Sequence, residues 1–567
     1  MADTDLYCPD SPKSPPELDW ISLLEAIQQN DLPQLHHYVS SVSAEAIPGR
    51  TSPYYEDPFF LAASEAQPET LRILLDVYAS SATTDPAETF KEKRGFSLTH
   101  VACRSANVEI VRFILDNREN LESRLALGVA DLDSRDRRSD NTPIMEAAAS
   151  LSELYLDAAK AENRNIDRNS WFHDRIEKAE QVIHLLLDRG CSATDVVPPL
   201  RIGKYVESQP QDSVLGLAVS RASKALVQRL ITSGADVFLK HMHFHDIPAM
   251  FLFRQGRERV HDVTTLHKAS MFWNADILGL LLDYRWNEEK FGRDLTVARD
   301  SNGGLPLHWA AAGPGRDECK LRDEELRTRI SKTFQLLLSS VPGTINMADN
   351  VGFTPLHYAV QAHAACGGSA HAEAAIQCLL EHGADPTITS SNGQTVLHML
   401  GYCSLGGRPI SGAVLDSLMA HGVDINHANN KGITALHVMV QNLRQISTVR
   451  YLLEHGADPR TSITSTGNTA FHLVADGRLP VELITEDGEY KNTTAEDYIK
   501  AQDEMLRLLQ ASTGGDTLMG QRNLAGKTAL ELLREVRQQR RERLEQMRSG
   551  AGRGRGRGCG SAQRPGE

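Results

Sequence analysis

The chain has 567 residues, of which 41% are hydrophobic and 24% are charged, so it can build a large core and is not disordered throughout. Its net charge of −14 argues against a protein built mainly to coat nucleic acid. No run of about 18 apolar residues predicts a membrane helix, and the acidic, proline-rich start lacks the apolar core of a secretory signal. The 8 cysteines contain no CxxC pair, so we expect reduced thiols and a cytoplasmic or nuclear protein.

The first part of the chain, residues 19–240, has the pattern of degenerate helical repeats behind a disordered, proline-rich head at 1–18. Residues 20–39 resemble one short helix pair. After it, a polar residue that can cap a helix is repeatedly followed by apolar residues. Such segments begin at Asp57, Ser97, Thr142 and Ser213.

Residues 241–262 form an insertion between repeats that contains His241, His243 and His245. On a β-strand these three side chains project to one face, where three imidazoles would converge on Zn²⁺ or Cu²⁺. Asp246 and His261 are candidate further ligands, and no cysteine is adjacent. The alternative is a polar loop with incidental histidines. We favour the loop and predict no cofactor, which leaves a metal-binding protein as a minor hypothesis.

Residues 263–475 contain well-defined repeats of the pattern Gly352-Phe-Thr-Pro-Leu-His357. Threonine caps a helix, and proline occupies the first turn, where its missing N–H costs nothing. A second apolar segment follows with helical spacing, and a glycine, as in Glu381-His-Gly-Ala-Asp-Pro386, ends it. The copies end at His267, His308, His357, His398, His437 and His472.

These motifs resemble the ankyrin-repeat family, whose unit of about 33 residues is a β-turn and two antiparallel helices with a Thr-Pro-Leu-His signature. The resemblance implies an all-α repeat solenoid of stacked helix-turn-helix units with β-hairpin fingers. We predict roughly ten or eleven units with insertions, of which those at 476–535 are divergent. One insertion, 476–496, is assigned to the finger region between repeats. The resemblance also implies that each motif histidine bonds to the neighbouring turn and holds the repeats in register.

The sequence does not predict an enzyme. It contains no Gly-x-Ser-x-Gly, His-Glu-x-x-His or kinase motif. Ala525-Gly-Lys-Thr528 lacks the first glycine of a phosphate-binding loop and matches the turn and first helix of a repeat.

The family resemblance implies a non-catalytic scaffold or adaptor that binds partner proteins through the concave surface made by finger tips and first helices. Within the family, residues at the turn tips usually select the partner. In this sequence the corresponding residues are Asp349, Asn350, Val351, Ser391, Asn392, Asn429, Asn430, Lys431, Ser465 and Thr466.

The C-terminal part of the chain, 536–567, supports an alternative function. It combines the end of a basic helix with an Arg/Gly-rich, disordered tail in which Arg553, Arg555 and Arg557 alternate with glycine. Such a tail can bind RNA electrostatically, so an RNA-associated adaptor is the second hypothesis. The alternative is a tail that only solubilises the end of the chain. We expect no membrane partner.

Overall fold

The computed structural model describes residues 20–41, 57–80, 90, 95–125, 132–136, 139–152, 168–199, 201–202, 205–206, 208–244, 259–285, 291–314, 323–364, 373–403, 410–479, 482–484, 490–513 and 516–551. The head at 1–18, His245 and the three arginines of the Arg/Gly tail lie outside these residues. The chain divides into two compact units, Met1–His241 (unit 1) and Met242–Glu567 (unit 2). Each unit is described separately below.

Unit 1 is built mainly from pairs of consecutive helices. These pairs are α1 (Trp20–Gln29) with α2 (Leu32–Ser41), α3 (Pro58–Glu65) with α4 (Pro68–Ser80), α6 (Leu98–Arg104) with α7 (Val108–Asp116), α9 (Pro143–Ser152) with α11 (Arg168–Asp188), and α12 (Val214–Ala218) with α13 (Lys224–Thr232). A further helix, α8 (Arg118–Leu125), follows α7. Two short antiparallel ladders join β1 (Val196–Val197) to β4 (Asp212–Ser213), and β2 (Arg201–Ile202) to β3 (Tyr205–Val206).

Unit 2 continues the same alternation. Its pairs are α14 (Thr265–Met271) with α15 (Ala275–Asp283), α16 (Pro306–Ala312) with α17 (Asp323–Ser340), α18 (Pro355–Ala364) with α19 (Ala374–Glu381), α20 (Val396–Cys403) with α21 (Gly412–Ala420), α22 (Ala435–Met439) with α23 (Ile446–Glu454), and α24 (Ala470–Ala475) with α25 (Ala495–Thr513). The helix α26 (Ala529–Ala551) follows them. Short 3-10 turns are η3 (Gly292–Val297), η5 (Pro342–Asn346) and η7 (Asp516–Gly520).

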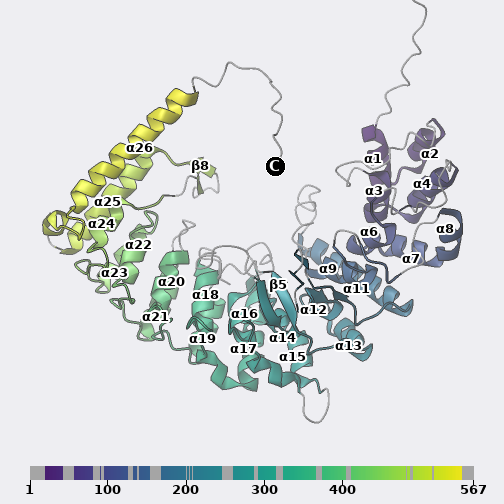
Figure 1. Cartoon of the computed structure of the whole chain (residues 1–567), viewed down its shortest axis with the longest axis horizontal. Helices are drawn as coiled ribbons and strands as arrows, with labels where there is room; N and C mark the ends of the chain where they lie inside the picture. The colour runs from purple at the N-terminus through teal and green to yellow at the C-terminus, as the bar shows by residue number, and fades with distance from the viewer. Residues whose placement is uncertain are drawn as a thin grey trace, which may run out of the picture. The chain divides into compact units, whose positions relative to one another are not determined.

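The first helices of successive pairs pack against one another, and so do most second helices. In unit 2, α14, α16, α18, α20 and α22 contact in sequence, and α15, α17, α19 and α21 do the same. Figure 1 shows these two rows of helices beside each other. The leucine of the motif is buried in each of these five first helices of unit 2, at Leu266, Leu307, Leu356, Leu397 and Leu436. The core of unit 2 is therefore one continuous layer that runs along its stacked helices.

One predicted insertion lies elsewhere than expected. Residues 476–496, assigned to the region between two repeats, fall between α24 and α25, which are the two helices of one pair. This segment contains β7 (Glu482–Ile484), which pairs antiparallel with β8 (Tyr490–Asn492). The hairpin β5 (His241–Phe244) with β6 (Arg259–Val263) is an insertion that precedes a first helix, α14. None of the described helices combines the length and the hydropathy needed to cross a bilayer.

Replacement of Leu379 by Ala tests the nearest-neighbour character of the stack. Leu379 on α19 is fully buried, so the cavity should lower the free energy of unfolding by about 2–5 kcal/mol. Since each repeat packs only on its neighbours, we expect separable unfolding steps and faster hydrogen exchange in α17, α19 and α21 first. Urea unfolding combined with hydrogen-exchange mass spectrometry measures both quantities. Val297→Ala, at an exposed position, is the control, and one sharp transition of the whole mutant chain would contradict the expectation.

Candidate functional site

The motif histidines link each first helix of unit 2 to the finger of the next repeat; the finger is the turn before a first helix, for example residues 349–353. At the start of α18, the backbone N–H of Thr354 donates to Nδ1 of His357 over 3.2 Å. Nε2 of His357 lies 3.3 Å from the carbonyl oxygen of Gln394, which belongs to the next finger. Because Nδ1 accepts, Nε2 must carry the proton and donate.

The same pair of bonds recurs along unit 2. In each copy Nε2 of the histidine donates to a backbone carbonyl oxygen further along the chain. The pairs are His267 with Gly304, His308 with Phe353, His398 with Ile433, His437 with Thr461, and His472 with Lys527. The role that the resemblance implied for these residues is therefore confirmed. Burial lowers the pKa of His308 to about 3 and the pKa of His357 and of His398 to about 4, so all three rings are neutral near pH 7.

The fingers of unit 2 are joined directly to one another by backbone hydrogen bonds. The N–H of Asn350 donates to the carbonyl oxygen of Asn302 in the preceding finger over 2.9 Å, and that of Ser391 donates to Val351 over 2.9 Å. Equivalent bonds run from Asn430 to Asn392, from Thr464 to Lys431 and from Leu524 to Thr466. We call this series the finger ladder.

Each finger turns at a glycine that the next finger approaches closely. Gly352 has φ +85°, and a Cβ placed there would lie 2.6 Å from the backbone nitrogen of Ser391. Gly303, Gly393, Gly432 and Gly467 are equally crowded by their following fingers. Gly526 has φ +74° but open space around it, since no described finger follows.

Four of the ten predicted tip residues are occupied in building the fingers. The side chains of Asp349 and Asn429 are buried, and each accepts two backbone N–H groups of its own turn. The side-chain amides of Asn350 and Asn430 donate to the carbonyl oxygens of Ser301 and Ser391, in the preceding fingers. These four side chains are structural.

Five of the six remaining predicted residues present free side chains on consecutive fingers. The side chains of Ser391, Asn392, Lys431 and Ser465 are exposed, and that of Val351 is half-buried. The side chains of these five form no hydrogen bond or ion pair within the described part of the chain, whereas the hydroxyl of Thr466 accepts the N–H of Asn468. We call Val351, Ser391, Asn392, Lys431 and Ser465 the tip surface.

One histidine of the insertion, His241, has a structural role. Nε2 of His241 lies 2.8 Å from Oγ of Ser213, and His241 is fully buried. Ser213 begins α12 at the position of the motif threonine, and Gly216 stands where the motif has its histidine. A Cβ on Gly216 would lie 3.1 Å from Cε1 of His241. His241 thus fills the space that the missing motif ring would occupy.

The other predicted ligands do not complete a metal site in the described chain. The ring of His243 lies 5.3 Å from that of Trp309, centroid to centroid, and His245 falls outside the described residues. Within the described ranges no three His, Cys, Asp or Glu side chains gather where they could hold a metal ion. The sequence signal for His241 was present in Ser213-Val-Leu-Gly216, where the motif lacks its histidine.

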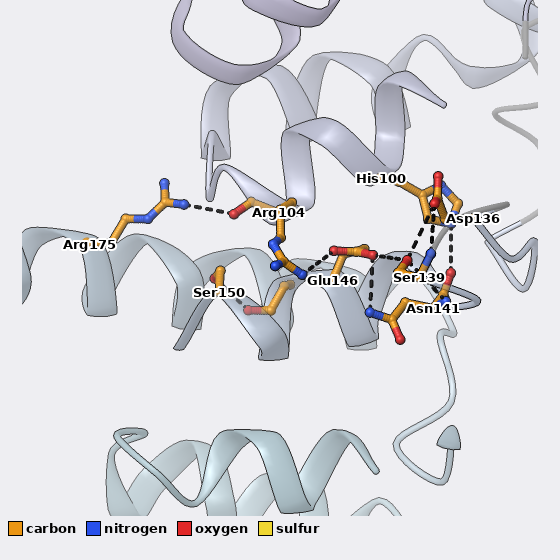
Figure 2. Close-up of polar contacts among 9 residues, drawn as sticks. His100, Arg104, Asp136, Ser139, Asn141, Glu146, Ser150 and Arg175 are labelled. Atoms are coloured by element: carbon orange, nitrogen blue, oxygen red, sulfur yellow. Dashed lines mark hydrogen bonds and ion pairs between the residues drawn. The ribbon is translucent and has the colours of Figure 1, made fainter. Parts of the chain in front are cut away.

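A buried polar cluster in unit 1 was not found by sequence reasoning. Figure 2 shows Glu146 of α9 at its centre. The carboxylate accepts from Arg104 over 3.0 Å, from the amide of Asn141 over 3.1 Å and from the hydroxyl of Ser139. Arg175 of α11 donates to the carbonyl oxygen of Arg104. Since both carboxylate oxygens already accept from these donors, the cluster ties α6, α9, α11 and a finger together and offers no free base.

Arginines of the basic helix pack against the repeats. Arg537 of α26 donates to Gln502 and Asp503 of α25, and the guanidinium carbon of Arg540 lies 3.5 Å from the ring centroid of Tyr498. Arg553, Arg555 and Arg557 lie outside the described residues, and no observation supports an RNA contact.

Comparison with known proteins identifies the repeats. A family model described as an ankyrin repeat matches residues 351–391, and one described as ankyrin repeats (3 copies) matches residues 400–495. The chain is therefore an ankyrin-repeat protein with a helix-rich repeat fold. A solved structure, the ankyrin repeat domain of Bcl-3, is 21% identical over 46% of this chain and 93% of that chain, with a TM-score of 0.30. No protein among curated sequences matches.

The neutral motif histidines predict a loss of stability in mild acid. Their folded pKa values lie below the unfolded value of about 6.5, so between those values the unfolded chain binds protons that the folded chain does not. Their contribution is complete above about pH 6.5 and falls by up to about 1.4 kcal/mol per pH unit for each histidine as the pH drops toward about 4. Urea unfolding between about pH 7.5 and 5 tests this. A stability independent of pH in this range would contradict the assignment.

Two glycine substitutions separate backbone strain from loss of the finger ladder. Gly352→Ala and Gly526→Ala both force alanine into a positive φ, which costs about 1 kcal/mol. Only Gly352→Ala also drives a Cβ into the next finger, so we expect it to lower the unfolding free energy by about 1–3 kcal/mol more than Gly526→Ala. Equilibrium urea unfolding of the two variants measures the difference. Equal losses would show that the ladder contributes little.

Proposed function

We propose that this protein is a non-catalytic scaffold or adaptor that binds a partner protein through the tip surface. Ankyrin repeats are generally protein–protein interaction modules. The observation that carries the proposal is the difference between the backbone and the side chains of the fingers. Their backbones are fixed by the ladder, while the five side chains of the tip surface have no partner within the described chain. A surface held in place before binding loses little conformational entropy when it binds.

The composition of the tip surface supports a partner with polar complementary groups. Along four consecutive fingers it presents the half-buried Val351, two hydroxyls, one amide and one ammonium group. Such groups favour hydrogen bonds to a partner's backbone or side chains and a carboxylate opposite Lys431. The four structural residues behind them keep the spacing of these groups constant.

We also infer that the ankyrin-type array extends beyond the matched residues, over roughly ten or eleven units from α1 to α26. Support comes from the first helices α1, α3, α6 and α9, which contact one another in sequence as those of unit 2 do. His100 of α6 further supports it, since its Nε2 donates to the carbonyl oxygen of Asn141 in the following finger over 3.1 Å.

A cytoplasmic or nuclear location is proposed on the chemistry of the thiols. Cys103, Cys191 and Cys378 are free and buried. Burial raises the pKa of Cys191 to about 12 and the pKa of Cys378 to about 11, so these thiols stay protonated and unreactive. Localisation of the tagged full-length chain by microscopy tests this proposal.

The proposal predicts different effects for the free and the structural tip residues. The variant Ser391→Ala/Asn392→Ala/Lys431→Ala/Ser465→Ala should weaken partner binding at least about tenfold without lowering the melting temperature. The matched variant Asn350→Ala/Asn430→Ala removes two bonds between fingers and should lower the melting temperature. Affinity purification from the native cell and thermal unfolding measure the two effects. A fourfold variant that still recovers the same partners would disprove the assignment of the tip surface.

A further inference from the structure

Large apolar side chains are rarely exposed in the described chain, and most of the exposed ones lie at the two ends of the repeats. Five such side chains are exposed: Ile21, Val297, Met347, Leu524 and Leu530. Ile21 belongs to α1, and Leu524 and Leu530 belong to the last described finger and to α26. Exposed apolar residues grouped on one surface usually mark an interface.

At the C-terminal end, positions that the next repeat covers elsewhere in unit 2 are exposed. Leu530 occupies the position of the motif leucine, which is at most 2% exposed at Leu266, Leu307, Leu356, Leu397 and Leu436, yet Leu530 is 39% exposed. Leu524 at the finger tip is 73% exposed, and the space around Gly526 is open. The carbonyl of Ala525 is next in the finger ladder, and within the described residues it accepts no hydrogen bond.

The same end carries an unpaired cation. Arg534 lies one helical turn after Leu530, is exposed, and forms no ion pair or hydrogen bond within the described chain. Neighbouring charges are paired, since Lys527 contacts Glu535 and Arg537 contacts Asp503. Leu524, Leu530 and Arg534 are named the C-terminal face.

The N-terminal end has a matching arrangement. Leu23, Ala26 and Ile27 of α1 are buried, and α1 packs on α2 and α3. Its opposite side exposes Ile21, which is 66% accessible, and the carboxylate of Glu25, which has no partner among the described residues. Ile21 and Glu25 are named the N-terminal face. They have the same i, i+4 spacing as Leu530 and Arg534, so each face presents an apolar group followed one turn later by a charge.

We propose that the C-terminal face of one copy of this chain docks on the N-terminal face of a second copy. In unit 2, first helices lie side by side with all their fingers joined at one end, so consecutive first helices run parallel. The same parallel stacking between copies places Leu530 on Ile21 and Arg534 opposite Glu25. The apolar pair supplies attraction, and the opposite charges set the register.

Such a contact is heterologous, because each copy contributes a different face. It therefore builds head-to-tail chains or closed rings and not isolated symmetric dimers. The faces are small, so the association is expected in the micromolar range and weakens with added salt, which screens the exposed charges.

Sedimentation velocity of the full-length chain over a concentration series tests the proposal. Glu25→Lys and Arg534→Glu each place like charges opposite one another and should raise the dissociation constant at least about tenfold. The double variant Glu25→Lys/Arg534→Glu restores the opposite charges and should return the constant to within about threefold of the native value. Glu454→Lys, at an exposed glutamate on α23, is the matched control and should change nothing. Circular dichroism verifies that each variant is folded.

Three results would overturn the proposal. The first is a native chain that remains monomeric up to about 100 µM, which would assign both faces to another occupant. The second is a double variant no better than the single ones, and the third is a control as defective as they are. Because neither face includes the tip surface, partner recovery by the single variants distinguishes failure of this proposal from failure of the proposed function.

Discussion

The two hydrogen bonds of the motif imidazole are the contact on which the rest of the repeat structure depends. In His357 one nitrogen accepts the backbone N–H that opens its own helix, and the other donates to a carbonyl in the next finger. Both bonds are buried, so each would be costly to leave unmade. They fix one tautomer of a neutral ring, the distance between first helix and finger, and hence the place where the ladder can form. The position of the tip surface therefore depends on these two bonds.

The exceptions show that the constraint belongs to the position and not to the residue. At α12 the motif histidine is replaced by Gly216, and His241 from the following hairpin occupies the vacant space and bonds to Ser213. At α26, which no described finger follows, Glu531 stands at the histidine position. Its carboxylate accepts the N–H of Thr528, and its own N–H donates to the hydroxyl of Thr528. At α9 Met145 stands at the histidine position, and the hydroxyl of Thr142 donates forward to Asp195, while Glu146 bonds backward to Arg104 of α6 and to Ser139 of its own finger.

Sequence alone was sufficient for features decided by neighbours in the chain. The Thr-Pro-Leu-His pattern predicted helix starts because capping and the histidine contact with its own threonine span three residues. It could not separate Asn350 from Asn392, which are both asparagines at finger tips. Asn350 bonds to Ser301, 49 residues earlier, whereas Asn392 makes no side-chain bond in the described chain. Nor could it show that His241 is used within the core, or that 476–496 joins two helices of one pair, since both depend on which segments become neighbours after folding.

The direction of the histidine contact gives the array a polarity that matters when it is shortened. A fragment that stops after α19 keeps His357 but loses the carbonyl of Gln394, so the ring that accepts the first N–H of α18 is no longer held from its other side. A fragment that begins at residue 349 lacks His308, which donates to the carbonyl oxygen of Phe353 in the intact chain. Water can reach that carbonyl in the fragment and replace the lost donor. Truncation from the front should thus be tolerated better than truncation from the back. Well-behaved fragments of this chain should begin at a finger and end with a helix whose first turn, like that of α26, carries no histidine.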